Sequence, residues 1–499
     1  MLCWKLLFSA LFHCLFGTIS YSHNTIFNPL EASIRLFINS SVPNLTQDTQ
    51  AWLWSLSSAS VSVGGTIGAL FVGFLAEKLG RKHTCILVYN LLFILGCVLQ
   101  FLARYLASLE LLIFGRLLVG ASQVLCCFTP VYLMECAPDQ WRGVIAMVVS
   151  VGYPVWNTLG TVLGMPQMLG GQKWSLALLA PALLTIAHLA TLPVFPDSPK
   201  YLYLSKGNHK KASEAIHFYH GAQSDVQEVE QEYWLEVSQI SLGRQSYISW
   251  QTLLSTRHLR TPFLICILAS IANRMGGIDI VTQYSTSSLS VLGISANQSA
   301  IYTVFLIQMP SILLATLGIV LSTKMGRRPH LLSMLGIGFV AVLLLFLSEF
   351  AFLGEISPFF ALAGLLFGQS AFYLGSGSIP RFLPAELCPQ VIRATTVGAL
   401  NAVSNIVSIA VLLLYPPLKQ VVGAYALTPL LLVGGVCFVW LFKEMPETQN
   451  RTVDEIVQSW VEDGKIEEKE PLLVAKLVKQ YEAVENIVKE LENEGLLGV

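Results

Sequence analysis

The sequence predicts an all-α membrane protein with 12 transmembrane helices arranged as two six-helix bundles. Composition is the first reason: 54% of the 499 residues are hydrophobic, 12% are charged, and the mean hydropathy is +0.61. Soluble domains do not carry that much apolar surface. The second reason is a basic turn after an apolar stretch, written twice about 250 residues apart, as GFLAEKLGRK at 73–82 and LSTKMGRR at 321–328. Such a repeat indicates a duplicated bundle.

Apolar stretches supply the predicted helices, because a transmembrane helix needs about 20 mostly apolar residues. Windows of that length place helices at 4–22, 55–76, 84–103, 109–134, 143–165, 173–195, 262–286, 299–322, 330–350, 358–384, 394–417 and 423–443. Residues 1–17 have a second interpretation, a cleaved signal peptide, since an apolar run there carries one lysine. That run lacks a clear small-residue cleavage site, and its removal would leave an odd number of helices in a duplicated fold.

Charged loops orient the predicted helices. Lysine and arginine collect in alternate short loops, so both termini are predicted to be cytoplasmic. Three Asn-x-Ser/Thr sequons fall in loops that this orientation places outside the cytoplasm, and glycosylation requires that exposure. The predicted glycosylation sites are Asn39, Asn44 and Asn297. Asn450 also lies in a sequon, but the same orientation leaves it inside and unmodified.

Two predicted bundles flank a charged linker. The expected divisions are a first bundle at 1–199, a cytoplasmic helical linker at 200–260, a second bundle at 261–445 and a cytoplasmic tail at 446–499. The net charge of −1 argues against a nucleic-acid partner. Ten cysteines show neither metal-ligand spacing nor a disulfide framework, so we interpret them as small buried hydrophobes and predict no metal and no cofactor.

Five short strings occur in a fixed order along residues 16–456. They are Gly115-Arg116; the set Pro130, Tyr132, Glu135, Pro138, Arg142 and Gly143; PDSPKYLYL at 196–204; the set Gly375, Gly377, Ile379, Pro380, Phe382, Glu386 and Arg393; and PETQNRTVDEI at 446–456. In this order they resemble the signatures of the sugar-porter branch of the major facilitator superfamily, the relatives of facilitative glucose transporters. The resemblance implies the major facilitator fold and alternating access to a solute site.

Charge pairs at the cytoplasmic helix ends form the predicted gate. Exposed ion pairs are each worth about 0 to 1 kcal/mol, so several together can hold one side closed and still break. The predicted gating residues are Glu77, Arg81, Glu135 and Arg142 in the first half and Arg327, Glu386 and Arg393 in the second. Asp197, Lys200 and Glu447 would extend these networks, and Thr323 stands where the family has an acidic residue. The alternative is that these charges serve topology and solubility.

The predicted substrate site departs from the family. The resemblance implies amide side chains that match sugar hydroxyls and aromatic rings that cover the apolar face. At the equivalent positions this chain has Ser150, Asn273, Arg274, Asp279, Ser311, Arg381 and Ala402, none of which is the family residue. Asn401, Asn405, Tyr284 and Gly277 survive. The predicted substrate-binding residues are therefore Ser150, Asn273, Arg274, Asp279, Gln283, Tyr284, Ser311, Arg381, Asn401 and Asn405.

The charges in that set have two interpretations. An arginine at membrane depth costs about 3 kcal/mol on insertion scales, so Arg274, Asp279 and Arg381 should face water or one another. In the first interpretation, Arg274 or Arg381 meets an anionic solute. In the second, Asp279 neutralises one arginine and the pair is structural.

Ion coupling has few candidate residues. Proton-linked relatives carry an aspartate in the first span, and the simplest alignment places Ser22 there. His23 can titrate near neutral pH, but a lone histidine at a helix end is more often polar lining. Asp279 is the remaining carboxylate at membrane depth. The sequence therefore favours uniport down the solute gradient.

The tail beyond Ile456 carries two signals of its own. Glu468 to Leu473 fits an acidic dileucine pattern, so Leu472 and Leu473 are candidates for contact with sorting machinery. Residues 474–491 follow the spacing of an amphipathic helix.

Together these observations predict facilitative transport of a hexose-like or small polar solute in the plasma membrane, with an endosomal membrane as the alternative. The partners expected are a small-molecule substrate and the lipid bilayer. Two other functions stay open, an organic-anion transporter of the same family with a urate-like substrate and a non-transporting nutrient sensor. An enzyme is not expected, because the soluble segments are too short for a catalytic domain.

Overall fold

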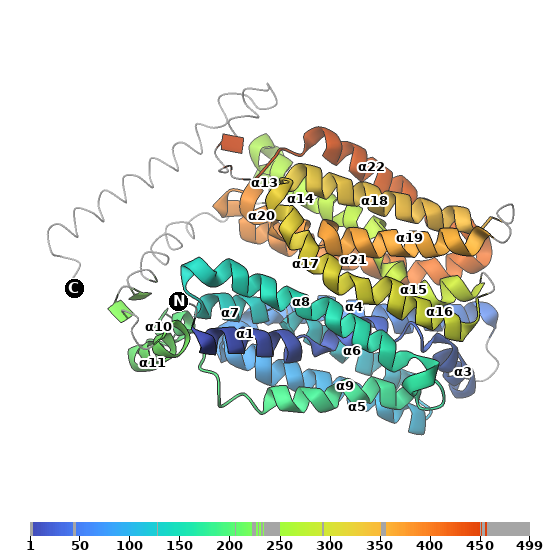
Figure 1. The fold of residues 1–499 in the computed structure, drawn as a ribbon, viewed down its shortest axis with the longest axis horizontal. Helices are drawn as coiled ribbons and strands as arrows, with labels where there is room; N and C mark the ends of the chain where they lie inside the picture. Colours follow the sequence, from blue (N-terminus) through green and yellow to red (C-terminus); the bar gives the residue numbers. More distant parts are fainter. Residues whose placement is uncertain are drawn as a thin grey trace.

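The computed structural model describes residues 3–42, 46–126, 128–204, 206–221, 226–227, 229–230, 233, 250–291, 294–350, 356–449, 451 and 455–456. Throughout this part the regular secondary structure is helical, as predicted. Figure 1 shows two groups of long helices lying side by side, with α8 and α17 adjacent along the boundary.

The first group contains the helices that precede the linker. These are α1 (Trp4–Phe16), α2 (Ser22–Thr25), α3 (Glu31–Ser41), α4 (Gln47–Leu79), η2 (His83–Val88), α5 (Tyr89–Tyr105), α6 (Leu109–Cys126), α7 (Thr129–Cys136), α8 (Asp139–Gly164), η3 (Pro166–Gly170) and α9 (Trp174–Leu189). Close approach of α4 and α6 depends on glycine. A Cβ at Gly64 would lie 2.0 Å from the Leu117 carbonyl oxygen, and one at Gly120 would lie 1.9 Å from that of Val61. Small residues of this kind let membrane helices pack backbone to backbone.

The second group follows the linker. It contains α14 (Arg257–Met275), α15 (Ile278–Val291), α16 (Ala296–Tyr302), η4 (Thr303–Gln308), α17 (Met309–Lys324), α18 (Arg327–Ser348), α19 (Ser357–Ala371), η6 (Phe372–Ser376), α20 (Ile379–Leu387), α21 (Gln390–Val422), η7 (Gly423–Leu427) and α22 (Thr428–Glu444). Two membrane segments of this group are interrupted and do not run as one continuous helix. Gly277, with φ of +81°, separates α14 from α15, and the backbone kinks at Gly375 before α20.

Each of the twelve predicted membrane segments overlaps helix in the structure. Eight helical stretches among the described residues are long and apolar enough to cross a membrane. One of them, Thr395–Glu444, covers the last two predictions and folds back at Gly423, whose φ is +58°. The first prediction corresponds to the 13-residue α1 followed by shorter turns, and the sixth to the 16-residue α9. The eight stretches are therefore fewer than the predictions partly because helices are merged or interrupted.

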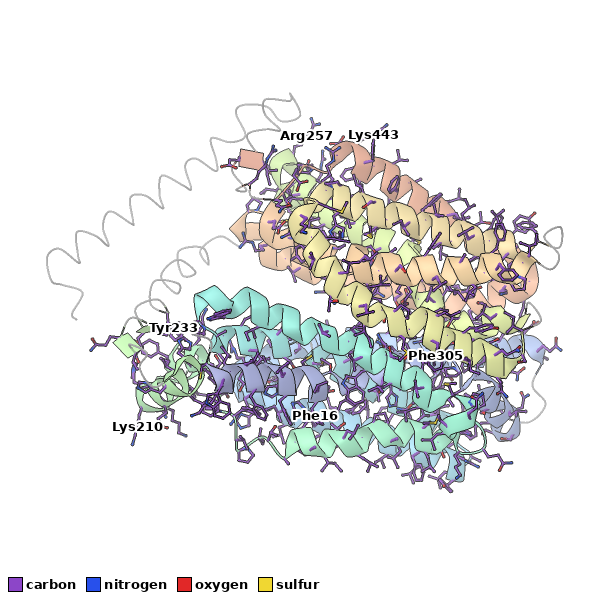
Figure 2. All side chains as sticks on the ribbon, viewed as in Figure 1. Phe16, Lys210, Tyr233, Arg257, Phe305 and Lys443 are labelled. Atoms are coloured by element: carbon purple, nitrogen blue, oxygen red, sulfur yellow. The ribbon has the colours of Figure 1, made fainter. Side chains whose placement is uncertain are left out.

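The linker helices dock on the first group. They are α10 (Pro199–Leu204) and α11 (His209–His220), and α13 (Trp250–Ser255) precedes α14. Tyr219 of α11 lies 2.6 Å, hydroxyl to hydroxyl, from the buried Tyr132 of α7, and both hydroxyls donate to the Pro196 carbonyl. In Figure 2 the labelled Lys210 and Tyr233 lie at the end of the first group where the chain begins. The predicted tail helix and dileucine pair lie outside the described residues.

The two groups share a hydrophobic core. Buried Phe27 and Trp54 from the first group belong to the same cluster as Tyr284, Leu412 and Tyr415 from the second. Helix α4 packs along α21, and α8 packs against η4 and α17. This boundary is where a site between the halves would lie.

Candidate functional site

The first predicted gate motif consists of Arg81, Lys82, Glu135, Asp197 and Ser198. It joins the turn after α4 to the end of α7 and to the segment before α10. Arg81 Nε donates to Glu135 Oε2 over 3.1 Å, and Ser198 Oγ donates to the same oxygen over 2.6 Å. The backbone N–H of Lys82 donates to Asp197 Oδ1 over 3.1 Å. The predicted gating residues Arg81 and Glu135 therefore form an ion pair, and Asp197, predicted to extend the network, bonds the next residue of the same turn.

The second gate motif repeats this arrangement after α17. Arg327 Nε donates to Glu386 Oε1 over 3.1 Å, and Thr448 Oγ1 donates to Glu386 Oε2 over 2.7 Å. The backbone N–H groups of Arg327 and Arg328 donate to the two oxygens of Glu447 over 2.8 and 3.3 Å. The sequence duplication thus extends to individual hydrogen bonds.

Both motifs depend on a glycine in the left-handed region. Gly80 has φ of +96° and Gly326 has φ of +83°. A Cβ on Gly80 would lie 2.5 Å from Asp197 Oδ2, and one on Gly326 would lie 2.7 Å from Glu447 Oε2. Glycine is required twice over, by the backbone angle and by the carboxylate that caps the turn.

The structure describes fewer contacts for the other predicted gating residues. Arg393 Nη2 donates to the Cys388 carbonyl over 3.5 Å, beside the second gate motif in sequence. Glu77 lies in α4 and Arg142 in α8, and their side chains are outside the described part. The two ion pairs described above each tie elements within one half.

The predicted charged pair in the second group is formed. Arg274, in the last turn of α14, donates through Nη1 to Asp279 Oδ1 over 3.1 Å. Arg274 Nε donates to Ser404 Oγ over 2.9 Å, and Ser408 Oγ donates to Asp279 Oδ1 over 2.9 Å. Because Ser404 and Ser408 are one turn apart on α21, a single helix face holds both members of the pair.

Four more predicted substrate residues lie near the end of α14, within α15 and on α17. Asn273 and Gln283 each have a buried amide oxygen that accepts no hydrogen bond from the described residues. The Tyr284 hydroxyl donates to the Leu412 carbonyl over 2.8 Å, and Ser311 Oγ donates to a carbonyl within its own helical turn.

The last predicted substrate residues lie on three helices. Arg381 of α20 and Asn401 of α21 are exposed, and Asn405 of α21 is half-buried. Ser150 lies in α8, with its side chain outside the described part.

An amide cluster that the sequence prediction missed lies between the halves. Asn157 Nδ2 donates to the Tyr373 hydroxyl over 3.0 Å, and Thr158 Oγ1 donates to the Gln308 carbonyl over 3.1 Å. Gln369 Nε2 donates to Gln308 Oε1 over 2.9 Å. Each of the three amides is buried, and Asn157 Oδ1, Gln308 Nε2 and Gln369 Oε1 find no partner among the described residues. An amide inside an apolar stretch is the sequence signal that would have found them.

A second polar contact joins the halves near α15. Asn28 Nδ2 donates to Ser285 Oγ over 2.5 Å, and the backbone N–H of Thr286 donates to Asn28 Oδ1 over 2.9 Å. All three residues are buried. One side chain of the first group therefore bonds both a hydroxyl and a backbone group of the second.

Comparison with known proteins identifies the family to which this chain belongs. A family model described as "Sugar (and other) transporter" matches residues 9–460. The chain belongs to this sugar transporter family. Sheep solute carrier family 2, facilitated glucose transporter member 3, is 28% identical over 476 residues, which cover 92% of this chain and 94% of the relative. The human member 14 is 27% identical, with 89% of this chain and 86% of the relative covered.

Solved structures support the fold of this family member. The inward-open xylose transporter XylE from E. coli matches with a TM-score of 0.73 at 20% identity, covering 91% of this chain and 99% of that one. A partially occluded inward-open form of XylE matches with a TM-score of 0.71. The chain is thus a multi-pass membrane transport protein of the major facilitator fold, and its relatives are transporters rather than enzymes.

Proposed function

We propose that this chain carries a neutral, hydroxyl-rich solute of hexose size across the membrane by alternating access, down the solute gradient. The curated relatives are facilitated glucose transporters, and they align over nearly the whole chain. The amide cluster at the boundary between the halves supports the same class of substrate.

The observation that carries the proposal is the unsatisfied chemistry of that cluster. A carboxamide donates and accepts, so it matches a hydroxyl, which also does both. Asn157, Gln308 and Gln369 each keep one buried amide atom without a partner among the described residues. Because an orphaned buried polar group costs about 1–3 kcal/mol, a ligand hydroxyl that bonds it gains that amount of compensation.

The pairing of Arg274 argues against an anionic substrate. Its guanidinium already bonds Asp279 and Ser404, so a carboxylate ligand would have to displace the Asp279 carboxylate. This favours the structural interpretation of the pair. The organic-anion and sensor alternatives gain no comparable support.

The two gate motifs fit the requirements of alternating access. Arg81 and Arg327 are each about one-fifth exposed, so their ion pairs remain partly solvated and individually weak. Because each pair ties elements within one half, the glycine turn and the ion pair together help each half keep its shape while the halves rock. Ser22, the residue aligned with the first-span aspartate of proton-linked relatives, carries no titratable group, which supports uniport.

We also propose that both termini are cytoplasmic and that the protein resides in the plasma membrane. Asn39 and Asn297 are exposed, as a glycan requires, and Asn44 lies outside the described residues. Leu472 and Leu473 remain candidates for a sorting contact from the cytoplasmic tail.

Uptake into proteoliposomes tests the function. The purified full-length protein is reconstituted without an ion gradient, and labelled glucose, fructose and urate are compared. Saturable hexose uptake without proton flux is expected. Uptake of urate alone would contradict the neutral-solute site, and uptake of none of the three would favour a sensor or another substrate class.

A further inference from the structure

Two cysteines of the second group lie close together, one in α14 and one at the end of α20. Cys266 of α14 and Cys388, the residue that ends α20, have their sulfur atoms 4.0 Å apart. Both side chains are fully buried, in a cluster that includes Leu383 and Ile392. They are 122 residues apart in sequence, so only the fold brings them together.

The surroundings of Cys388 favour the thiolate. The pKa of its thiol lies below the ordinary value, first because the Cys266 thiol hydrogen-bonds to it. The Arg393 guanidinium acts in the same direction, against the effect of burial. The thiolate is the nucleophilic form of cysteine, and an adjacent arginine favours it.

We propose that Cys266 and Cys388 form a site of reversible oxidation by hydrogen peroxide. The Cys388 thiolate attacks one peroxide oxygen, giving a sulfenic acid and hydroxide. The Cys266 sulfur then attacks that sulfenic sulfur, and water leaves as the disulfide forms. Two thiols lose two electrons in total, and the peroxide accepts them.

The geometry suits this chemistry. A disulfide has an S–S bond of about 2.05 Å, so the sulfur atoms must approach by about 2 Å, a movement within reach of side-chain rotation. Burial makes the site selective, because a peroxide molecule is close to water in size whereas glutathione disulfide is much larger. The pair is therefore matched to a small oxidant.

The bond would restrict the second half where it is built to bend. Helix α14 ends at the Gly276–Gly277 break, and α20 begins after the kink at Gly375. Discontinuous helices line the substrate sites of many transporters, and alternating access moves the bundles around such a site. A disulfide would join the two segments on the same side of their breaks, next in sequence to Glu386 of the second gate motif. Oxidation is expected to slow transport severalfold.

Peptide mapping of the full-length protein tests the site. Purified protein in detergent is treated with hydrogen peroxide, its remaining thiols are alkylated, and the digest is searched for a Cys266–Cys388 linked peptide. The linked peptide is expected in the wild type and disappears with dithiothreitol. In Cys266→Ser, which lacks the resolving thiol, a dimedone adduct on Cys388 is expected instead. Absence of both products would overturn the proposal.

A matched control separates this pair from general thiol oxidation. Cys437 of α22 is also buried in the second group, so Cys437→Ser should leave the linked peptide unchanged. Thermal melting of each variant checks that it is folded. Slowing of labelled glucose uptake by peroxide rests on the proposed function, whereas the linked peptide does not. If glucose uptake is absent but the linked peptide forms, the proposed substrate is contradicted and the proposed thiol site is still supported.

Discussion

Arg274 and Asp279 form an ion pair across the break between α14 and α15, with 3.1 Å between Nη1 and Oδ1. The side chain of Arg274 is one-fifth exposed and that of Asp279 is 8% exposed, so the carboxylate depends more strongly on its partner. Ser404 and Ser408 supply one further bond to each. A helix break in a membrane protein frees backbone groups, and this pair fixes the two helix ends that meet there.

Replacement of Asp279 should therefore destabilise the protein through the arginine that it leaves behind. Asp279→Asn removes the negative charge and keeps the shape, so we expect a loss of about 1–3 kcal/mol from an unpaired, largely buried cation. The double variant Asp279→Asn with Arg274→Gln removes both charges and should recover part of that loss. Thermal unfolding in detergent measures both. A double variant that melts below the single one would show that the pair is not coupled.

The gate turns give a second prediction. Gly80→Ala should lower stability and slow transport, because its Cβ would lie 2.5 Å from Asp197 Oδ2 on a backbone with φ of +96°. Gly326→Ala should behave alike, since its Cβ would lie 2.7 Å from Glu447 Oε2. Melting temperature and uptake rate are the measurements.

Two further glycines separate the causes of that effect. Gly423 also has positive φ, and a Cβ there would meet nothing within 4 Å among the described residues, so Gly423→Ala reports backbone strain alone. Gly73 lies inside α4 with nothing within 4 Å, so Gly73→Ala should be neutral or stabilising. Equal losses in Gly80→Ala and Gly423→Ala would show that the carboxylate contact adds nothing.

The fold was largely predictable from the sequence, for physical reasons. Apolar stretches of about 20 residues can only be satisfied as helices in a bilayer, so the helical segments could be located by composition. The breaks within them were harder. Gly277 and Gly375 are visible as glycines, but a glycine in a membrane helix also serves close packing, as Gly64 does. Composition alone does not separate these two uses.

The candidate site was predicted less well than the fold. Glu135 and Glu386 stand in the strings of fixed order, and Arg81 and Arg327 stand in the duplicated basic turn. The structure pairs each arginine with a glutamate. The amide cluster was missed because the prediction followed positions aligned with the family, where this chain has changed. Gln308 is three residues before the aligned Ser311, almost one helical turn. A polar function can move to a neighbouring turn and keep its place in space.

Substitutions in the amide cluster should change substrate affinity. Gln308→Ala and Gln369→Ala each remove groups that can bond a hydroxyl, at about 0.5–1.5 kcal/mol per hydrogen bond. We expect KM for the transported hexose to rise by about 2- to 10-fold in each. The melting temperature should fall as well, because each substitution breaks the bond between Gln308 and Gln369. Gln100→Ala is the control, because Gln100 is a buried glutamine of α5 that bonds only within its own turn in the described part. An equal rise of KM in Gln100→Ala would place the effect in folding rather than binding.

Loss of the Asn28 contact should loosen the junction between the halves. Asn28→Ala removes the bonds to Ser285 and to the Thr286 backbone, about 1–3 kcal/mol together, which corresponds to a shift of about 5- to 150-fold in the equilibrium between closed and open junctions. Hydrogen exchange of the peptide around Thr286 should accelerate accordingly, because its N–H loses an acceptor. Asn90→Ala is the matched control, since Asn90 bonds His188 within the first group and should leave this peptide unchanged. Exchange that is as slow in Asn28→Ala as in the wild type would show that the apolar contacts between α4 and α21 hold the junction without this side chain.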